Sequence, residues 1–284
     1  AKYTPKEWHP KQQEVLDRIK EHTTIDDEEA KRNSERFLYV KGRPGSGKTA
    51  VSIEGAVRAA KDGLTVLIVC PTGALVCAMK EWLPEFDGVE RIYVDTIHSV
   101  LKYKRDRDNK VEFVPPSGFR KYEVVFCDEG SQYDDLEWQR LYQTVREQPH
   151  SPYVVVVADF QQLRPMSNGS MCKQFCEAMQ SIELVTSYRS TCPEHLLFLN
   201  RIREGQPDRT TLAEYFRDRH WGDADLEECV AYGLELAAAR GKVFTWLTST
   251  NRGASAVCRA ALAHKGISDD DLLAGYQGDP ASKS

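Results

Sequence analysis

The chain has 284 residues, of which 41% are hydrophobic and 29% are charged. This length suits two domains, and this composition excludes a disordered, collagenous or disulfide-stapled chain. The formal net charge of -5 excludes a polybasic protein that holds nucleic acid by bulk charge, although it leaves room for a narrow basic groove. The chain begins at Ala1 without a methionine and ends in a polar stretch, so we expect a fragment of a longer protein.

The first 185 residues repeat one pattern: a short apolar run, a turn or glycine-rich loop, and then an amphipathic stretch. The runs show little polar alternation, which is typical of strands covered on both faces of a sheet. The pattern predicts an α/β fold with a parallel sheet whose ligands bind at the carboxyl ends of its strands. A helix is expected at residues 49–60, ended by a cationic turn and Gly63. The expected strands are residues 37–40, 65–70, 91–94, 124–127 and 153–158.

Residues 102–116 break this pattern, because two short strand-like pieces flank Asp108-Asn109 and predict a hairpin. From Lys102 to Lys121, seven basic and three acidic residues give a local net charge of +4 inside an acidic chain. Two interpretations are open. The segment is either a solvated surface hairpin or an arm beside a nucleic-acid groove.

After residue 181 the chain changes character. Residues 193–204 and 253–265 look helical, residues 210–240 are helix-rich and acidic, and residues 242–248 (KVFTWLT) read as a strand. One internal strand is too few for a sheet of ordinary size. We therefore expect a first domain at residues 1–182, with the hairpin inserted at about 101–121, and an incomplete second α/β domain at residues 183–284.

The apolar runs are far shorter than the ~20 residues that a membrane span needs. The eight cysteines form no C-x-x-C pair, and free thiols in a reducing, intracellular compartment are favoured over disulfides. Cytoplasm and nucleus are not distinguished. Cys172 and Cys176 share a helical face, but no second ligand pair with suitable spacing follows, so we expect no metal site there.

The strongest motif is Gly42-Arg43-Pro44-Gly45-Ser46-Gly47-Lys48-Thr49, a full G-x-x-x-x-G-K-[ST] between an expected strand and an expected helix. Glycines let backbone N–H groups converge on phosphate oxygens, and the helix N-terminus adds partial positive charge. The motif predicts a P-loop that binds the phosphates of a nucleotide. In it, Lys48 reaches the β- and γ-phosphates, and the Thr49 hydroxyl ligates Mg²⁺.

Two further strands end in polar residues. The run at 124–127 delivers Asp128, which can hold Mg²⁺ through water, and Glu129, which can polarise an attacking water. The run at 153–158 delivers Asp159 and then Gln162, whose uncharged amide can bond a γ-phosphate or a water. This makes Gln162 a candidate sensor of hydrolysis, although a solvated loop glutamine is the alternative interpretation.

In order and spacing, these motifs resemble those of superfamily 1 helicases, and within them the RecD/PIF-type branch, over residues 12–251. The P-loop and residues 128–132 look like the first two helicase motifs, and residues 158–165 look like the third, G-D-x-x-Q-L-x-P. Five further segments look like parts of that branch. They are CPTGA at 70–74 and DTIHS at 95–99, where it contacts single strands, and LVTSYR at 184–189 with LNRIREG at 199–205, where it enters its second domain; LTSTN at 247–251 resembles the strand and Asn that follow.

The resemblance implies two RecA-like domains and roles for residues that the motifs match. Gln12, with Gln13 as the rival, would read adenine. Tyr188 would stack on the base, and Arg189 would reach the γ-phosphate as an arginine finger. The basic hairpin falls where this branch carries an accessory wedge.

The resemblance also implies that Pro71, Thr72, Gly73 and His98 lie along single-stranded nucleic acid. For His98, a satisfied core histidine is the alternative. Single-stranded DNA is the expected partner and RNA the alternative. Replication or repair proteins are further candidate partners, and no membrane is expected.

The sequence departs from the family pattern at several positions. Ala158 stands where Gly is usual, Gly130 where Ala is usual, and Arg164 where Pro is usual. The later motifs of the second domain, including its last arginine motif, are not found. This indicates either truncation within the second RecA-like domain or a divergent protein, and it puts full unwinding in doubt.

The sequence thus predicts an ATP-dependent nucleic-acid motor that uses ATP and Mg²⁺. By resemblance it is a 5′→3′ DNA helicase. The first alternative is a nucleotide-dependent nucleic-acid-binding module without unwinding activity. The second is a P-loop kinase of small molecules, which is disfavoured because Asp128-Glu129 and Gln162 suit activation of water.

Overall fold

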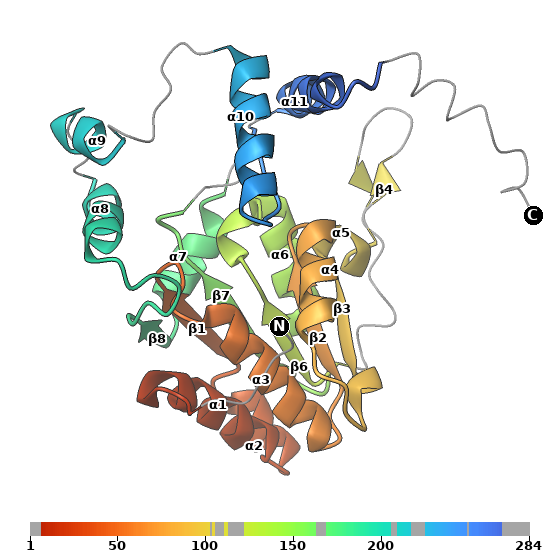
Figure 1. Ribbon diagram of the computed structural model, residues 1–284. Helices are drawn as coiled ribbons and strands as arrows, with labels where there is room; N and C mark the ends of the chain where they lie inside the picture. Colours follow the sequence, from red (N-terminus) through yellow and green to blue (C-terminus); the bar gives the residue numbers. More distant parts are fainter. Residues whose placement is uncertain are drawn as a thin grey trace, which may run out of the picture. The chain divides into compact units, whose positions relative to one another are not determined.

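In the computed structural model, a parallel sheet of six strands, in the order β3-β2-β6-β7-β1-β8, forms the core of residues 1–203 (Figure 1). Every pairing between neighbouring strands is parallel. The structure describes residues 7–102, 104–105, 111–112, 122–162, 169–205, 209–216, 225–248 and 250–268. The strands of the sheet are β1 (Phe37–Gly42), β2 (Val66–Cys70), β3 (Ile92–Thr96), β6 (Val124–Cys127), β7 (Tyr153–Ala158) and β8 (Ser181–Leu184). The predicted α/β fold with a parallel sheet is confirmed.

Helices cover both faces of this sheet (Figure 1). One face packs against α1 (Pro10–Thr23), α3 (Lys48–Lys61) and α4 (Gly73–Trp82). The other packs against α5 (Ile97–Val100), α6 (Asp135–Arg146) and α7 (Met171–Glu177). The short helix α2 (Glu28–Asn33) follows α1, and two 3-10 turns, η1 (Val89–Arg91) and η3 (Gly130–Gln132), precede β3 and α6.

Strand β2 shows why the apolar runs are continuous. Val66, Ile68 and Cys70 belong to the hydrophobic cluster under α1, α3 and α4, whereas Leu67 and Val69 belong to the cluster on the opposite face. All five side chains are at most 1% exposed. Because successive residues of a strand point to opposite faces, a sheet covered on both sides needs an apolar residue at every position.

Strand β8 was not predicted. Its residues alternate between exposed and buried, so it lacks the continuous apolar run of the other strands. It lies at the edge of the sheet beside β1, where Lys41 pairs with Glu183 and their side chains approach to 3.8 Å between Nζ and Oε1. An edge strand with one covered face has this alternating pattern.

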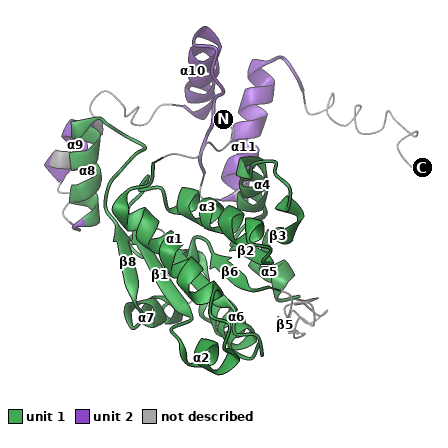
Figure 2. Ribbon diagram, turned by 90° about the horizontal axis from the view of Figure 1, so that it is seen from below, with its two compact units in different colours: residues 1–203 green, residues 204–284 purple. Residues whose placement is uncertain are grey.

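The chain divides into two compact units, Ala1–Arg203 and Glu204–Ser284, which Figure 2 colours separately. The predicted domain boundary after residue 182 falls inside β8, and the first unit continues through α8 (Pro193–Arg203). The extent of two RecA-like domains along the chain stays a prediction.

The second unit is helical in its described part, with α9 (Arg209–Phe216), α10 (Leu226–Ala239) and α11 (Asn251–His264). The prediction of a strand at residues 242–248 is wrong, because these residues form no regular structure. Their valine, phenylalanine and tryptophan favour a strand, but a strand needs a partner for its backbone hydrogen bonds. Among the described residues of this unit, there is no other strand to supply one.

The hairpin inserted after α5 is present in the parts that are described. Strands β4 (Lys104–Arg105) and β5 (Val111–Glu112) pair antiparallel, with Lys104 opposite Glu112. This confirms the predicted hairpin, whose remaining residues, including Asp108 and Asn109, lie outside the described residues. The interpretation of the hairpin as an arm beside a nucleic-acid groove stays a prediction.

All eight cysteines are free thiols, and Cys70, Cys127, Cys172 and Cys176 are buried. In the described ranges, no three or more His, Cys, Asp or Glu side chains gather closely enough to hold a metal ion by themselves. Of the helices that the structure describes, none has both the length and the apolar character to cross a membrane.

Candidate nucleotide and nucleic-acid site

Each strand of the sheet is followed, at its carboxyl end, by a segment singled out in the sequence. Because all six strands are parallel, these segments meet at one edge of the sheet. In sheet order they are His98 after β3, Pro71–Gly73 after β2, Asp128-Glu129 after β6, Asp159 after β7, the P-loop after β1, and Tyr188-Arg189 after β8.

The P-loop connects β1 to α3 as predicted. Gly47 adopts the left-handed conformation, with φ of 81°, immediately before α3 begins at Lys48. The Lys48 ammonium donates to the carbonyl oxygens of Gly42, at 2.9 Å, and Arg43, at 3.2 Å. Burial lowers the pKa of Lys48, and the negative charge of Glu129 opposes this effect. Lys48 therefore lies inside the loop as a partly desolvated cation beside an acidic residue.

A cavity of about 330 Å³ opens above the P-loop. Its size lies in the range of small-molecule sites. Every residue that lines it was predicted from the sequence as part of the nucleotide site. These residues are Pro44, Gly45, Ser46, Gly47, Lys48, Thr49, Glu129, Gln162, Tyr188 and Arg189. The structure thus brings the P-loop, the acidic pair, the glutamine and the Tyr-Arg segment to one cavity.

The acidic pair, Asp128-Glu129, directly follows β6 at the carboxyl edge of the sheet. Asp128 is only 1% exposed, and its pKa is raised to about 7 because burial and the neighbouring Glu129 both disfavour the charged form, while Lys48 opposes them. Glu129 has a φ of 48°, in the left-handed region, which costs a non-glycine residue about 1–3 kcal/mol and is typical of functional sites. Within the described residues, Asp128 Oδ2 and Glu129 Oε2 are buried without a hydrogen-bond partner.

These orphaned carboxylate oxygens fit a hard cation. Mg²⁺ takes oxygen ligands and is bound in nucleotide sites by one or two protein oxygens together with substrate phosphates. Thr49, whose hydroxyl is the second candidate ligand, lines the same cavity as Glu129. Asp128 and Thr49 stay the predicted ligands of the ion.

Gln12 and Tyr188 both lie close to Gly47. A methyl group on Gly47 would lie 2.6 Å from Gln12 Nε2 and 3.7 Å from Tyr188 Cδ2. Gln12 is buried in the first turn of α1, where its Nε2 donates to Ser46 O at 3.4 Å. Gln13 instead donates to Asp17 on an exposed surface of α1. Of the two rival glutamines, the structure therefore places Gln12 beside the P-loop.

The segment after β8 crosses directly over the P-loop. The Tyr188 N–H donates to Gly45 O at 2.8 Å. Tyr188 itself is 56% exposed, so its ring is available to a planar group in the cavity that it lines. Arg189 lines the same cavity.

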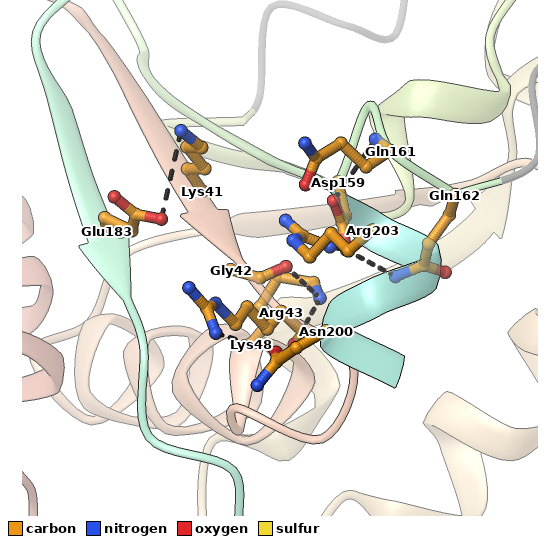
Figure 3. Close-up of polar contacts among 10 residues, drawn as sticks. All are labelled: Lys41, Gly42, Arg43, Lys48, Asp159, Gln161, Gln162, Glu183, Asn200 and Arg203. Atoms are coloured by element: carbon orange, nitrogen blue, oxygen red, sulfur yellow. Dashed lines mark hydrogen bonds and ion pairs between the residues drawn. The ribbon is translucent and has the colours of Figure 1, made fainter. Parts of the chain in front are cut away.

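The strand end of β7 carries an ion pair that sequence reasoning missed. Arg203 Nη1 donates to Asp159 Oδ2 at 2.8 Å, and Gln162 Nε2 donates to the same oxygen at 3.0 Å (Figure 3). Arg203 lies within LNRIREG, which was matched to the entry of a second domain and not to the nucleotide site. The remainder of the third motif, residues 163–165 with Arg164, lies outside the described residues.

The two segments predicted to contact nucleic acid lie side by side. Cys70 and Thr96 are paired at the ends of β2 and β3, so Pro71–Gly73 and His98 follow at neighbouring strand ends. Thr72 is exposed and caps α4, because its hydroxyl accepts from Leu75 N at 3.3 Å. His98 is not a core histidine, since 56% of its side chain is exposed, and its Nε2 lies 2.6 Å from Glu137 Oε1.

The parallel sheet with a P-loop at its carboxyl edge defines a P-loop nucleotide-binding protein of RecA-like fold. Residues 28–221, more than half of the chain, match a family described as an AAA domain. The chain therefore belongs to this family. Among curated proteins, none matches the chain.

Two solved structures share the fold. The first describes DNA unwinding at forked duplex DNA by two coordinating Pif1 helicases. It is 18% identical to this chain, with a TM-score of 0.51, and the match covers 73% of this chain and 51% of that one. The crystal structure of the Pif1 helicase from Candida albicans is 16% identical, with a TM-score of 0.55, over 84% of this chain and 55% of that one. The chain thus spans about half the length of these structures, and the predicted resemblance to PIF-type helicases is confirmed at the level of fold.

Proposed function

We propose that this chain is the ATPase part of a nucleic-acid motor, a helicase that couples ATP hydrolysis to translocation on single-stranded DNA and to duplex unwinding. One observation carries the proposal. Lys48 and Glu129 line one cavity with Gln162, so a phosphate-binding cation, a base and an amide converge on the same ligand. A protein that only held a nucleotide would need the first of these groups but not the other two.

The chemistry that we propose is attack of water on the γ-phosphorus of ATP. The bond from the γ-phosphorus to its bridging oxygen breaks as the water oxygen bonds, and ADP leaves. Glu129 takes the proton of the water, and its buried, unpartnered Oε2 is available to accept it. Lys48 and Arg189 neutralise the charge that spreads over the phosphoryl oxygens. Bound Mg²⁺ would add positive charge at the phosphates.

Recognition of the adenine is assigned to Gln12 and Tyr188. Both lie close to Gly47, where Gln12 would contact the adenine by its amide and Tyr188 by its ring. Gly42, Pro44, Gly45, Ser46 and Gly47 belong to the loop whose backbone would surround the phosphates, with Thr49 and Asp128 holding Mg²⁺.

The nucleic-acid partner is assigned to the β2–β3 end of the same edge. Pro71, Thr72 and Gly73 and the exposed His98 lie at adjacent strand ends and would contact a single strand. The resemblance implies single-stranded DNA as the partner, 5′→3′ polarity, and association with replication or repair proteins. RNA remains the alternative polymer.

The test is the rate of ATP hydrolysis with and without oligo-dT and oligo-rU. The motor predicts turnover that a single strand stimulates severalfold. Removing a general base typically costs about 10²–10⁴-fold in rate, so Glu129→Gln is expected to abolish turnover while ATP still binds. Glu177→Gln, on the exposed end of α7, is the matched control and is expected to keep full activity.

Each other outcome identifies an alternative. ATP binding that changes DNA affinity without turnover would indicate a binding module, and transfer of phosphate to a small molecule would indicate a kinase. Turnover that neither polymer stimulates would overturn the motor.

A further inference from the structure

Helix α8 contacts the nucleotide site through two side chains on one face. Asn200 Oδ1 accepts from Arg43 Nη1 at 3.0 Å, and Arg203 Nη1 donates to Asp159 Oδ2 at 2.8 Å. Asn200 and Arg203 are three residues apart, so they lie on the same side of the helix. One face of α8 is therefore bonded both to the P-loop and to the end of β7, as Figure 3 shows.

The Arg203–Asp159 ion pair is buried. Asp159 is 1% exposed on its side chain and Arg203 is 14% exposed. Removing one partner of a buried pair leaves a buried charge without compensation, which is strongly destabilising.

Gln162 depends on the same carboxylate oxygen. Its Nε2 donates to Asp159 Oδ2 at 3.0 Å, and the side chain lines the cavity above the P-loop. A side-chain amide is planar, so a bond to its nitrogen also sets the direction of its carbonyl oxygen. Asp159 thus determines how Gln162 presents its amide to the cavity, and Arg203 shares the oxygen that does so.

We propose that Arg203 is a positioning residue for the ATPase, which acts through Asp159 to hold the Gln162 amide in its orientation toward the nucleotide. This inference rests on the proposed function, because it concerns the Gln162 amide that lines the proposed ATP cavity. It also connects α8, the last helix of the first unit, to that residue through Asp159.

The electrostatics of Asp159 support this role. Burial alone would raise the pKa of Asp159, but the hydrogen bonds from Arg203 and Gln162 and the charge of Arg203 outweigh it, so the pKa lies below its usual value. Arg203 therefore contributes to keeping Asp159 charged, and the charged carboxylate is the acceptor that holds the Gln162 amide.

A direct contact of Arg203 with phosphate is the competing role. The structure favours the indirect one, because the Nη1 of Arg203 is already bonded to a buried carboxylate. Burial is the main cause of the lowered pKa of Lys48, and the positive charge of Arg203 lowers it further. The two cations therefore repel each other at this site. The experiments below distinguish the two roles.

The first experiment does not depend on activity. The side-chain amide resonance of Gln162 is assigned in a ¹⁵N–¹H spectrum by its loss in Gln162→Glu, and then followed in Arg203→Ala and Asn200→Ala. Asn200→Ala is the matched control, because it removes the other bond of the same helix face. We expect the Gln162 amide resonance to move in Arg203→Ala and to stay in place in Asn200→Ala. An unmoved resonance in Arg203→Ala, or equal changes in both variants, would overturn the proposal.

The second experiment is a double-mutant cycle on kcat and KM for ATP with Arg203→Ala, Gln162→Ala and the pair. Residues that act as one unit are not additive, so each single change is expected to lower kcat about tenfold and the pair no further. KM is expected to stay within about twofold, because uniform binding is unchanged. Additive losses with a raised KM in Arg203→Ala would instead indicate direct phosphate contact and overturn the positioning role.

The two proposals fail separately. A wild-type chain without ATPase activity would contradict the proposed function, while the Gln162 resonance would still report whether Arg203 positions it. Thermal unfolding of each variant shows whether a change in the spectrum reflects loss of the fold.

Discussion

Gly45 and Arg189 are so close that a methyl group on Gly45 would lie 2.5 Å from the Cβ of Arg189. The contact joins the P-loop to the segment after β8, and the Tyr188 N–H bond to Gly45 O holds it at 2.8 Å. Gly45 also has a φ of 77°, which L-residues rarely adopt. The glycine therefore has two functions at once: a left-handed turn and the approach of a second segment to the nucleotide cavity.

Gly45→Ala is expected to destabilise the fold and to weaken ATP binding by tenfold or more. The left-handed backbone costs an alanine roughly 1–2 kcal/mol, and the clash with Arg189 adds to it. Gly63→Ala is the matched control, because Gly63 has a φ of 86° but nothing within 4 Å of the new methyl group. Urea unfolding and binding of a fluorescent ATP analogue measure both effects. Equal losses of stability and unchanged ATP binding in the two variants would show that the contact with Arg189 is unimportant.

Gln12→Glu is expected to reduce ATP affinity and the preference for ATP over GTP, whereas Gln13→Glu is expected to leave both unchanged. Glutamate at position 12 still accepts the bond from His9 N that caps α1, but it cannot donate as the Gln12 Nε2 does. Loss of one hydrogen bond is worth about 0.5–1.5 kcal/mol, which corresponds to about 2–10-fold in Kd. Competition titrations with both nucleotides measure it, and an effect of Gln13→Glu alone would reverse the assignment.

Asp128→Asn is expected to stabilise the nucleotide-free protein, more at pH 8 than at pH 5. The pKa of Asp128 is raised to about 7 in the folded protein, so the folded state favours the protonated carboxyl. Between the unfolded pKa of about 3.9 and the folded one, stability therefore falls as the pH rises. Each pH unit between the unfolded and the folded pKa corresponds to about 1.4 kcal/mol, so at pH 8 the gain in free energy of unfolding is expected to exceed about 1 kcal/mol.

Asp159→Asn is the counterpart with the opposite sign. Because the pKa of Asp159 is lowered in the folded protein, its charge stabilises the fold above the unfolded pKa, and this contribution is lost as the pH falls through the folded pKa. Asp159→Asn is therefore expected to destabilise the protein at neutral pH. Denaturant midpoints at pH 5 and pH 8, with a chelator present, test both variants, and Asp159→Asn is expected to destabilise the protein equally at the two pH values because both lie above the unfolded pKa. A destabilising Asp128→Asn at pH 8 would contradict the account of the acidic pair.

His98→Gln is expected to weaken binding of fluorescent oligo-dT by about 2–10-fold, the loss of roughly one hydrogen bond, without changing ATP affinity. Glutamine can still donate to Glu137, so the buried end of that pair keeps a partner. The control is His150→Gln. His150 precedes β7 at the opposite edge of the sheet, and its Nε2 contacts Tyr122 O. Fluorescence anisotropy measures both variants. Equal DNA affinities for the two would place the strand elsewhere.

The parts of the fold and site that the sequence predicts well are contiguous in the chain. The P-loop and Asp128-Glu129 each follow an uninterrupted apolar run, so both the strand and the position of the motif at its end are visible in one segment. The helical period also favours Gln12 over Gln13 as the residue beside the P-loop. Gln12 lies on the same buried face of α1 as Val15, Leu16 and Ile19. The order of the strands in the sheet depends on contacts that no local pattern records.

Other features depend on partners far away in the chain. Arg203 could not be assigned to the site from its neighbourhood, because Asp159 is 44 residues away and Arg201 in the same motif has the same chemistry. Strand β8 forms because β1 offers it an edge, although its own pattern is weak. Residues 242–248 have a strong strand pattern and form no strand, since the described part of that unit supplies no edge.

The central claim is that ATP and a single strand act on one another across one edge of the sheet. The most direct test measures the Kd for oligo-dT by fluorescence anisotropy in Glu129→Gln without nucleotide, with ATP and Mg²⁺, and with ADP and Mg²⁺. Coupling between two sites typically corresponds to about 5–150-fold in affinity and is reciprocal, so oligo-dT must change the ATP affinity by the same factor. We predict a Kd for oligo-dT that differs at least fivefold between the ATP and ADP states, with the matching change in ATP affinity. A Kd that is the same in all three states would contradict the account.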